Sequence, residues 1–222
     1  MVGKPPYRIP FFRFVGFVMR RIPIERKYWK EGVLWKTDLL SLKLDLAETK
    51  GCSFDWGDGN DVQFIARHPE TSGKHPVHAR RVEAGHRCFC ARKDGKVLAF
   101  NWVSFDSGWV NFGKDGELSF FPLPSRSVFT DDLYTYTDAR RQGIGALLKA
   151  HQFASLRSMG IDTAYSYILL SNTAPLALHL KLGSVPEALV YCLYLGNYRR
   201  AFMGTRGEAG RLKYWAQSLQ KP

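Results

Sequence analysis

The feature that most constrains this fold is a glycine-containing turn between a predicted strand and a predicted helix. Residues 127–137 are rich in strand-forming residues and lead into Arg140-Arg-Gln-Gly-Ile-Gly145. Beyond that turn, apolar residues recur at helical spacing until Gly160, a residue that suits a helix C-terminus. Glycines at the mouth of a helix let its free N–H groups approach an anion, and the helix dipole favours negative charge. The turn therefore predicts a site for an anion such as a pyrophosphate; the alternative is a tight turn with a purely structural role.

Two commoner phosphate-binding motifs do not fit this turn. No Gly-Lys-Ser/Thr follows the glycines, so the turn is not a Walker loop. The six-residue glycine spacing and the downstream acidic residue of a dinucleotide-binding fold are missing as well. The turn alone is thus a weak signal that depends on its context.

Further elements are predicted on both sides of the turn. Two strands flank Asp94-Gly95, a pair that suits the positive φ angles of a tight hairpin turn. A second helix is expected to start near Pro175 and to end at Gly183. Three more segments are read as strands: 164–170, 189–195 and 198–203. Residues 51–61 and 68–76 are read as loops, and residues 33–46 are read as a strand or a helix. Residues 10–19 are read as a strand or irregular packing, and the alternative for this segment is a membrane-surface anchor.

The charge of the chain favours an anionic partner. The net charge is +12, and the first 30 residues contain eight Lys or Arg against one Glu. Such a balance suits nucleic acid, an acidic lipid surface or a phosphorylated ligand, and the alternative is a solvated basic face on an ordinary enzyme. Four scattered cysteines, no apolar run of about 20 residues and no secretory signal lead us to expect a cytoplasmic setting.

The segment Thr130-Asp-Asp-Leu-Tyr-Thr-Tyr-Thr-Asp-Ala-Arg-Arg-Gln-Gly-Ile-Gly145 resembles the acetyl-CoA motif of the GNAT-type N-acetyltransferase superfamily, in which a strand leads into Arg-Gly-x-Gly-Ile-Gly. A second segment, Asn172-Thr-Ala-Pro-Leu-Ala-Leu-His-Leu-Lys-Leu-Gly183, is similar to the Asn…Leu-Tyr-x-Lys-Leu-Gly-Phe helix of that family. The resemblance covers about residues 86–203, and the first 80 residues add nothing recognisable. It implies one mixed α/β domain over residues 1–222, whose central, mostly antiparallel sheet is splayed at the cofactor strand.

The resemblance also implies a binding site for acetyl-CoA or another acyl-CoA. Backbone atoms of the strand end would lie along the pantetheine arm, amides of the turn would hold the pyrophosphate, and basic side chains, with Lys149 as a further candidate, would add charge complementarity. Solvated helix-end charge is the alternative for the arginines, and helix capping is the alternative for Asn172. The expected cofactor residues are Thr135, Tyr136, Thr137, Arg140, Arg141, Gln142, Gly143, Gly145, Ala146 and Asn172.

Three residues are candidates for the catalytic machinery that the resemblance implies. His179 stands where the family often has a tyrosine that protonates the thiolate, and the alternative is a packed or capping histidine. Asp131 is the candidate base, preferred over Asp132 because successive strand residues face opposite ways. Tyr134 is expected to shape the acceptor pocket.

The chain departs from the family pattern at two further positions. Thr137 replaces a proline, and Ser184 replaces a phenylalanine. The predicted activity is acetyl or longer acyl transfer to a primary amine in a ternary complex, with a small molecule or peptide as acceptor and no metal. The alternatives are a long-chain or carrier-protein donor, an aminoacyl-tRNA-dependent transferase, and a non-catalytic domain that binds acyl-CoA or nucleic acid.

Overall fold

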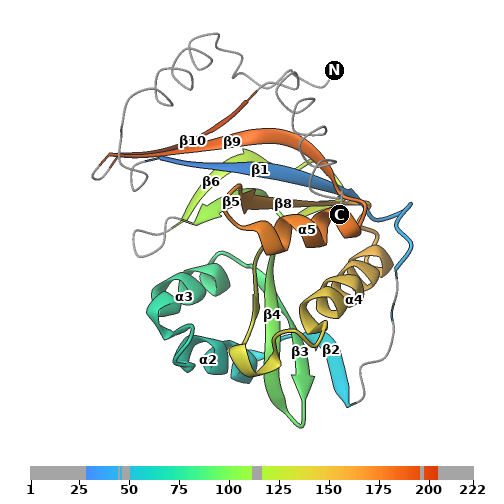
Figure 1. Ribbon diagram of the computed structural model, residues 1–222. Helices are drawn as coiled ribbons and strands as arrows, with labels where there is room; N and C mark the ends of the chain where they lie inside the picture. The colour runs from blue at the N-terminus through green and yellow to red at the C-terminus, as the bar shows by residue number, and fades with distance from the viewer. Residues whose placement is uncertain (1–28, 45, 47–50, 112–116, 196–197, 205–222) are drawn as a thin grey trace.

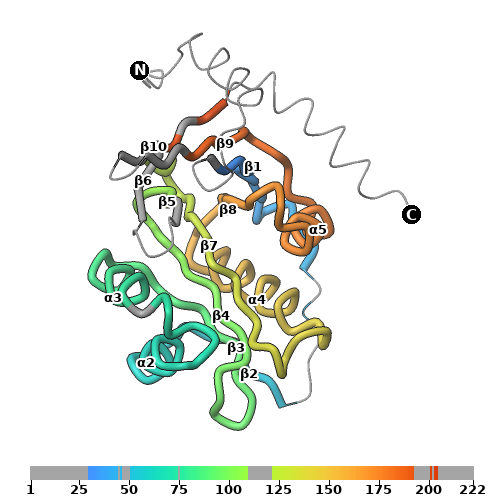
Figure 2. Tube along the Cα trace, turned by 60° about the vertical axis from the view of Figure 1, so that its left-hand side comes forward, coloured from blue at the N-terminus to red at the C-terminus, as the bar shows by residue number. Residues whose placement is uncertain are grey.

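The computed structural model describes residues 29–44, 46, 51–111, 117–195 and 198–204. Within them the chain forms a large mixed sheet whose strand order is β10-β9-β1-β8-β7-β4-β3-β2, and a separate β5–β6 hairpin. Figures 1 and 2 show α2 and α3 on one side of the β4 and β3 strands and α4 on the other. The strands are β1 Trp29–Asp38, β2 Cys52–Trp56, β3 Arg87–Lys93, β4 Lys96–Ser104, β5 Ser107–Asn111, β6 Glu117–Pro122, β7 Ser127–Thr135, β8 Thr163–Leu169, β9 Val185–Leu195 and β10 Tyr198–Met203. The helices are α2 Gly59–Arg67, α3 His75–Glu83, α4 Ile144–Ser158 and α5 Thr173–Lys181, with 3₁₀ turns at Ser72–Lys74 and Thr137–Ala139.

The predicted fold class is confirmed. Every described pairing of the large sheet is antiparallel except that of β7 with β8. These two strands, both described in full, pair over three residues, from Ser127↔Thr163 to Phe129↔Tyr165. Beyond Phe129 they separate, so the sheet is splayed where the resemblance placed the cofactor strand.

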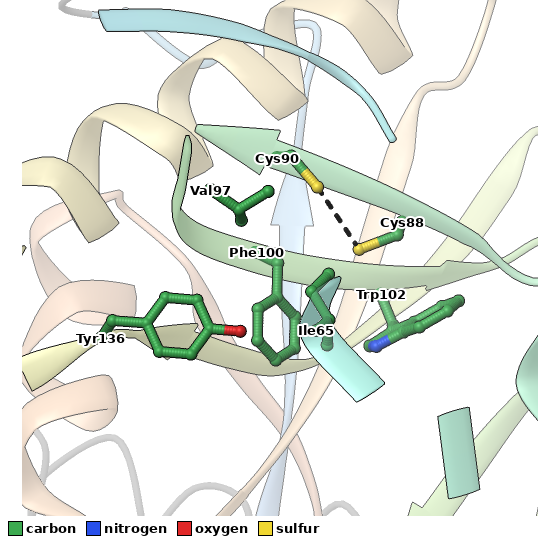
Figure 3. Close-up of a cluster of buried hydrophobic side chains, with 7 residues drawn as sticks. All are labelled: Ile65, Cys88, Cys90, Val97, Phe100, Trp102 and Tyr136. Carbon is green, nitrogen blue, oxygen red and sulfur yellow. Dashed lines mark hydrogen bonds between the residues drawn. The ribbon is translucent and has the colours of Figure 1, made fainter. Parts of the chain in front are cut away.

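Alternating side chains of β3, β4 and β7 form a separate core on each face of the sheet. On the α2 side, Ile65 packs with a cluster that includes Phe100, Trp102 and Tyr136 (Figure 3). The Cys88 and Cys90 side chains lie in the same cluster, with their sulfurs 3.7 Å apart, because residues two apart on a strand share a face. On the opposite face, Ile144 and Leu148 of α4 pack on Phe89, Ala91 and Ala99.

The elements predicted from residue 87 onward are confirmed. β3 and β4 form the expected hairpin, with Asp94 at φ 50° and Gly95 at φ 74°. The predicted strand and helix around the glycine turn are β7 and α4. The helix starting near Pro175 is α5, and the last two predicted strands are β9 and β10, although β9 begins four residues earlier than expected.

The expectations for the N-terminal third need correction. Residues 51–61 are not a loop, because Cys52–Trp56 form β2 and Gly59 begins α2. Asp58 caps α2 in a reciprocal capping box with Asp61, which explains why this acidic, glycine-rich segment starts a helix. Residues 68–76 contain a 3₁₀ turn and the first turn of α3. The 33–46 segment is a strand up to Asp38, and residues 10–19 lie outside the described residues.

None of the helices in the described residues has the length and the apolar composition that a membrane crossing requires.

Candidate functional site

The splay between β7 and β8 lies beside the N-terminus of α4. Gly143 is the N-cap of this helix and has a φ of 77°, a left-handed conformation that favours glycine. No side chain caps α4 in the structure as described, and the Ala146 N–H already donates to the Gly143 carbonyl at 3.0 Å, so the N–H groups of Ile144 and Gly145 are the ones left to face a ligand. This is the arrangement that binds anions at helix N-termini.

Gly145 packs closely against the end of β7. A Cβ atom on Gly145 would lie 3.0 Å from the Thr135 hydroxyl oxygen, so the helix start lies directly against the end of β7. The structure therefore brings together Thr135, Gly143 and Gly145, three of the residues predicted to contact a cofactor. These observations fit the pyrophosphate and pantetheine arm of CoA: uncapped N–H groups, a small residue at the contact and arginines beside it.

The two arginines of the turn differ in their surroundings. Arg140 donates from Nε to the Thr135 carbonyl oxygen at 2.9 Å and from Nη2 to the Tyr134 hydroxyl at 3.2 Å. Arg141 is exposed and has a φ of 62°. It stands where the family motif has glycine, so a side chain occupies a backbone conformation that costs about 1–2 kcal/mol for non-glycine residues.

The other predicted cofactor residues already have partners. The N–H of Tyr136 donates to the Leu98 carbonyl at 3.0 Å, and its buried ring packs on Phe64 and His68. Gln142 donates from its side chain to the Asp138 carbonyl at 3.0 Å, and the Ala146 N–H donates to the Gly143 carbonyl at 3.0 Å in the first turn of α4.

Lys149 does not lie at the turn. Its Nζ is buried under the sheet, among acceptors from β4, β7 and α4, so the idea that it adds charge for a phosphate is wrong.

Asp131 and Asp132 face the same side of β7, against the expectation that successive strand residues diverge. The β4–β7 register shifts between Phe100 and Trp102, and Asp132 has a φ of 51°. This bulge interrupts the alternation, as extra residues in a strand do. Both carboxylates contact Arg81 of α3: Asp131 at 2.5 Å and Asp132 at 3.1 Å.

The aspartate pair is neutralised by two cations. The Arg81 side chain is fully buried, and Lys74 lies 2.7 Å from Asp132. Burial raises the pKa of Asp132, but the charges of Arg81 and Lys74 outweigh it, so the pKa lies below its usual value. Asp132 is therefore ionised at neutral pH. Arg81 and Lys74 were not identified from the sequence, because nothing local links α3 to β7.

Tyr134 lies on the same side of β7 and is bound by a residue that sequence reasoning missed. Its hydroxyl donates to Glu70 at 2.8 Å, and Glu70 also accepts from the Thr137 N–H at 3.2 Å and the Thr137 hydroxyl at 2.9 Å. Burial, with the Glu70 contact, raises the pKa of Tyr134. Thr137 stands at the proline position of the family pattern, and both donors that it offers Glu70 are donors that proline lacks.

His179 and Asn172 lie on and before α5. His179 is 3 % exposed, and its Nδ1 lies 3.2 Å from the Ser184 hydroxyl. Burial, together with the positive charge of Lys149, lowers the pKa of His179 well below its usual value, so the imidazole is neutral at pH 7. Asn172 is the N-cap of α5, but its side chain makes no capping hydrogen bond.

A metal site is not suggested by the described residues, in which no three His, Cys, Asp or Glu side chains come together as ligands. The sequence-proximal histidines and cysteines have separate surroundings. His78, for example, stacks on Trp102 with ring centroids 5.7 Å apart, while His68 lies on Tyr136.

Comparison with known proteins agrees with this geometry. The sequence model of the family described as "Acetyltransferase (GNAT) family" matches residues 53–183, more than half of the chain. The match begins earlier than the resemblance noted above and takes in β2, α2 and α3. A search of curated proteins gives no match.

Solved structures share the fold at low sequence identity. The glucosamine N-acetyltransferase region of a fungal multi-domain β-N-acetylglucosaminidase is 16% identical over 90% of this chain and 24% of that one, with a TM-score of 0.58. A Drosophila protein is 14% identical over 83% of this chain and 59% of that one, with a TM-score of 0.55. A GCN5-related N-acetyltransferase from Sphaerobacter thermophilus is 12% identical over 86% of this chain and 57% of that one, with a TM-score of 0.52. The chain thus spans less than two thirds of each of these chains.

Proposed function

Because the chain belongs to the GNAT acetyltransferase family, we propose that it transfers an acetyl group from acetyl-CoA to a primary amine. The observation that carries this proposal is the contact of Gly145 with Thr135, which sets an uncapped helix N-terminus against the strand where the sheet splays. A helix start of this kind suits a pyrophosphate, and the end of the β7–β8 pairing at Phe129 leaves the later residues of β7 unpaired with β8, where the pantetheine arm runs in our proposal. Acetyl-CoA, when bound, supplies an acetyl thioester that an amine attacks.

We assign the cofactor side to the residues around α4. Amides of Gly143 and Gly145 bind the pyrophosphate, with Arg140 and Arg141 as flanking charges, and the Ala146 amide joins them by leaving the Gly143 carbonyl to which it donates at 3.0 Å. The end of β7 borders the pantetheine arm, and Asn172 at the start of α5 borders its far end. The backbone N–H and carbonyl groups of Thr135–Thr137 that already make hydrogen bonds limit which of these contacts form without rearrangement.

We assign the acceptor side to the opposite face of β7. Asp131 and Asp132 face the acceptor amine, and Asp131 is the base that accepts the proton lost by the attacking nitrogen as the amide bond forms and the thiolate leaves. Arg81 and Lys74 hold both carboxylates in place. Their charges also make the pair a weak base, so we expect it to act chiefly by orienting the amine.

Tyr134 is our choice for the acid that protonates the leaving thiolate. Its raised pKa keeps the phenol protonated at neutral pH, and its partly exposed hydroxyl lies on the same side of β7 as the aspartates. His179 was the expected acid, but a neutral, buried imidazole bound to Ser184 is better suited to positioning α5. The cytoplasmic setting stays a prediction.

Thermal-shift titration followed by a turnover assay tests the proposal. A ligand at 100 times its Kd adds about 2.7 kcal/mol of stability, which is a Tm rise of about 5–10 °C for a chain of this size. Acetyl-CoA, CoA and a long-chain acyl-CoA are compared, and thiol release is then measured with a panel of amines. A shift with acetyl-CoA and amine-dependent thiol release support the proposal. A shift with the long-chain compound alone favours a longer donor, and no shift with any of the three contradicts the proposal.

A further inference from the structure

A buried lysine lies at the point where β7 and β8 separate. Lys149 of α4 is 1 % exposed, and its Nζ donates to three side-chain oxygens. These belong to Asn101 of β4 at 2.7 Å, Thr130 of β7 at 2.6 Å and Gln152 of α4 at 3.2 Å. Three acceptors match the three donors of a protonated amine.

Two of these acceptors connect the ammonium to the β7 bulge. Asn101 donates from Nδ2 to the Asp131 carbonyl at 2.5 Å, directly across from the register shift. Thr130 precedes the bulge, follows the last residue of β7 that pairs with β8, and shares a 2.6 Å hydrogen bond with Ser166 of β8. Lys149 therefore fixes both the residue before the bulge and the side chain that binds the bulge carbonyl.

The bulge decides where the two aspartates point. Without it, strand alternation would turn Asp132 toward α4 and away from Arg81. With it, Leu133 instead packs on the α4 side, and Asp131 and Asp132 share the α3 side. The local geometry of the proposed acceptor site thus depends on a side chain on the other face of the sheet.

We propose that Lys149 is a positioning residue for the transfer reaction, acting through Asn101 and Thr130 to hold the β7 bulge that turns Asp131 and Asp132 toward the acceptor. The expected effect on kcat rests on the proposed function. The link from Lys149 to the bulge does not, because it is present in the protein without any ligand. The third acceptor, Gln152, lies on α4 itself, and its contact with Lys149 does not connect the lysine to a strand.

Charged groups on the neighbouring elements set the conditions for a test that uses pH. Asp131 of β7 favours the charged form of Lys149, while burial disfavours it. The charge of Lys149 lowers the pKa of His179 on α5, and the charge of His78 on α3 lowers the pKa of Asp132 from the other face of the sheet. Any pH response at the bulge therefore has to be compared between the wild type and a variant without the ammonium.

Three variants of the full chain separate the links. Lys149→Met removes the positive charge and all three N–H donors, and it keeps a side chain of similar length. Asn101→Asp keeps the oxygen that accepts from Lys149 and loses the donor to the Asp131 carbonyl. Gln152→Met removes an acceptor that is not connected to β7, and it is the matched control.

Two readouts decide the proposal. Backbone amide resonances of Asp131, Asp132 and Leu133, recorded without acetyl-CoA between pH 5.5 and 9, should shift with one common midpoint in the wild type and in Gln152→Met. That transition should be missing in Lys149→Met and smaller in Asn101→Asp, which keeps the contact of Lys149 with Thr130. With acetyl-CoA and an active amine, kcat should fall about tenfold to a hundredfold in the same two variants, while acetyl-CoA affinity changes less than threefold.

The failures are distinguishable. If the wild type neither binds acetyl-CoA nor turns over, the proposed function fails, and the resonance shifts still decide whether Lys149 holds the bulge. If the amide transition persists in Lys149→Met, or if kcat per folded molecule is unchanged in both variants, the positioning role is wrong. Should Lys149→Met fail to fold, the amide transition and kcat are compared between the wild type and Asn101→Asp instead.

Discussion

The Nδ1 atom of His179 lies 3.2 Å from the hydroxyl of Ser184, so two positions at which the chain departs from the pattern of its family bind each other. Ser184 in turn lies 2.7 Å from the hydroxyl of Thr37 on β1. A polar chain across α5 and β1 thus replaces the tyrosine and phenylalanine of the pattern. The departures are therefore coupled, and their first consequence is structural.

Ser184→Ala should destabilise the protein by about 1–3 kcal/mol, because it leaves buried groups of His179 and Thr37 without this hydrogen-bond partner. Urea unfolding of both proteins measures the difference. Ser158→Ala is the control, since its hydroxyl bonds the Ser155 carbonyl at an exposed position, and it should change stability by less than 0.5 kcal/mol, a rough bound for surface sites. Equal losses in both variants would contradict the role of the buried pair.

Tyr134→Phe should lower kcat by about two orders of magnitude with little change in KM, because it removes the proposed acid and leaves the ring in place. Because the pKa of Tyr134 is raised above that of an ordinary tyrosine, its own titration should not limit kcat between pH 6 and 9. Steady-state kinetics across that range test both points. Tyr167→Phe on β8 is the control. A wild-type kcat in Tyr134→Phe would show that another group acts as the acid.

Arg141 offers a comparison of two substitutions that remove the same charge. Arg141→Gly should be more stable than Arg141→Ala by about 1 kcal/mol, because residue 141 has a φ of 62° and glycine adopts that conformation without a Cβ clash. Both variants should bind acetyl-CoA more weakly, and their affinity should depend less on salt than that of the wild type. Denaturant unfolding and calorimetric titration separate the two effects. An alanine variant as stable as the glycine variant would argue against strain in the turn.

The stability of the wild type should rise with pH above neutrality. Burial lowers the pKa of Lys149 to about 7 in the folded state, against about 10.4 in an unfolded chain. Between these values the unfolded state binds more protons, so the Lys149 contribution to the free energy of unfolding increases with pH, by at most about 1.4 kcal/mol per pH unit, and this contribution is flat well below pH 7. The difference between wild type and Lys149→Met in urea unfolding at pH 6, 8 and 9 isolates this group, and a difference that does not vary with pH would contradict it.

The sequence was sufficient for the elements that carry regular patterns. The hairpin turn at Asp94-Gly95, the glycine turn and the two following helices all follow from local chemistry. α2 was missed because Gly57-Asp-Gly-Asn60 is typical of a loop, although Asp58 and Asp61 have the spacing of a capping box. That spacing was the available signal.

The site was less predictable because its parts meet through the tertiary fold. The expectation for Asp131 and Asp132 rested on strict alternation, and a bulge depends on the partner strand. Glu70, Lys74 and Arg81 reach β7 from the α2–α3 region, more than 45 residues away in the chain. Lys149 lies on the buried face of α4 and has no local signal that distinguishes it from a surface lysine. Each of these contacts is fixed by packing between elements and not by neighbouring residues.

Hydrogen–deuterium exchange with and without acetyl-CoA tests the central claim most directly. If the splay and the start of α4 form the cofactor site, acetyl-CoA should slow exchange in peptides that cover residues 133–147, while β2 and β10 stay unchanged. Coenzyme A without the acetyl group should protect the α4 start in the same way, because the pyrophosphate is common to both. Saturating acetyl-CoA with no protection at 133–147, or protection confined to another part of the chain, would contradict the assignment of this site.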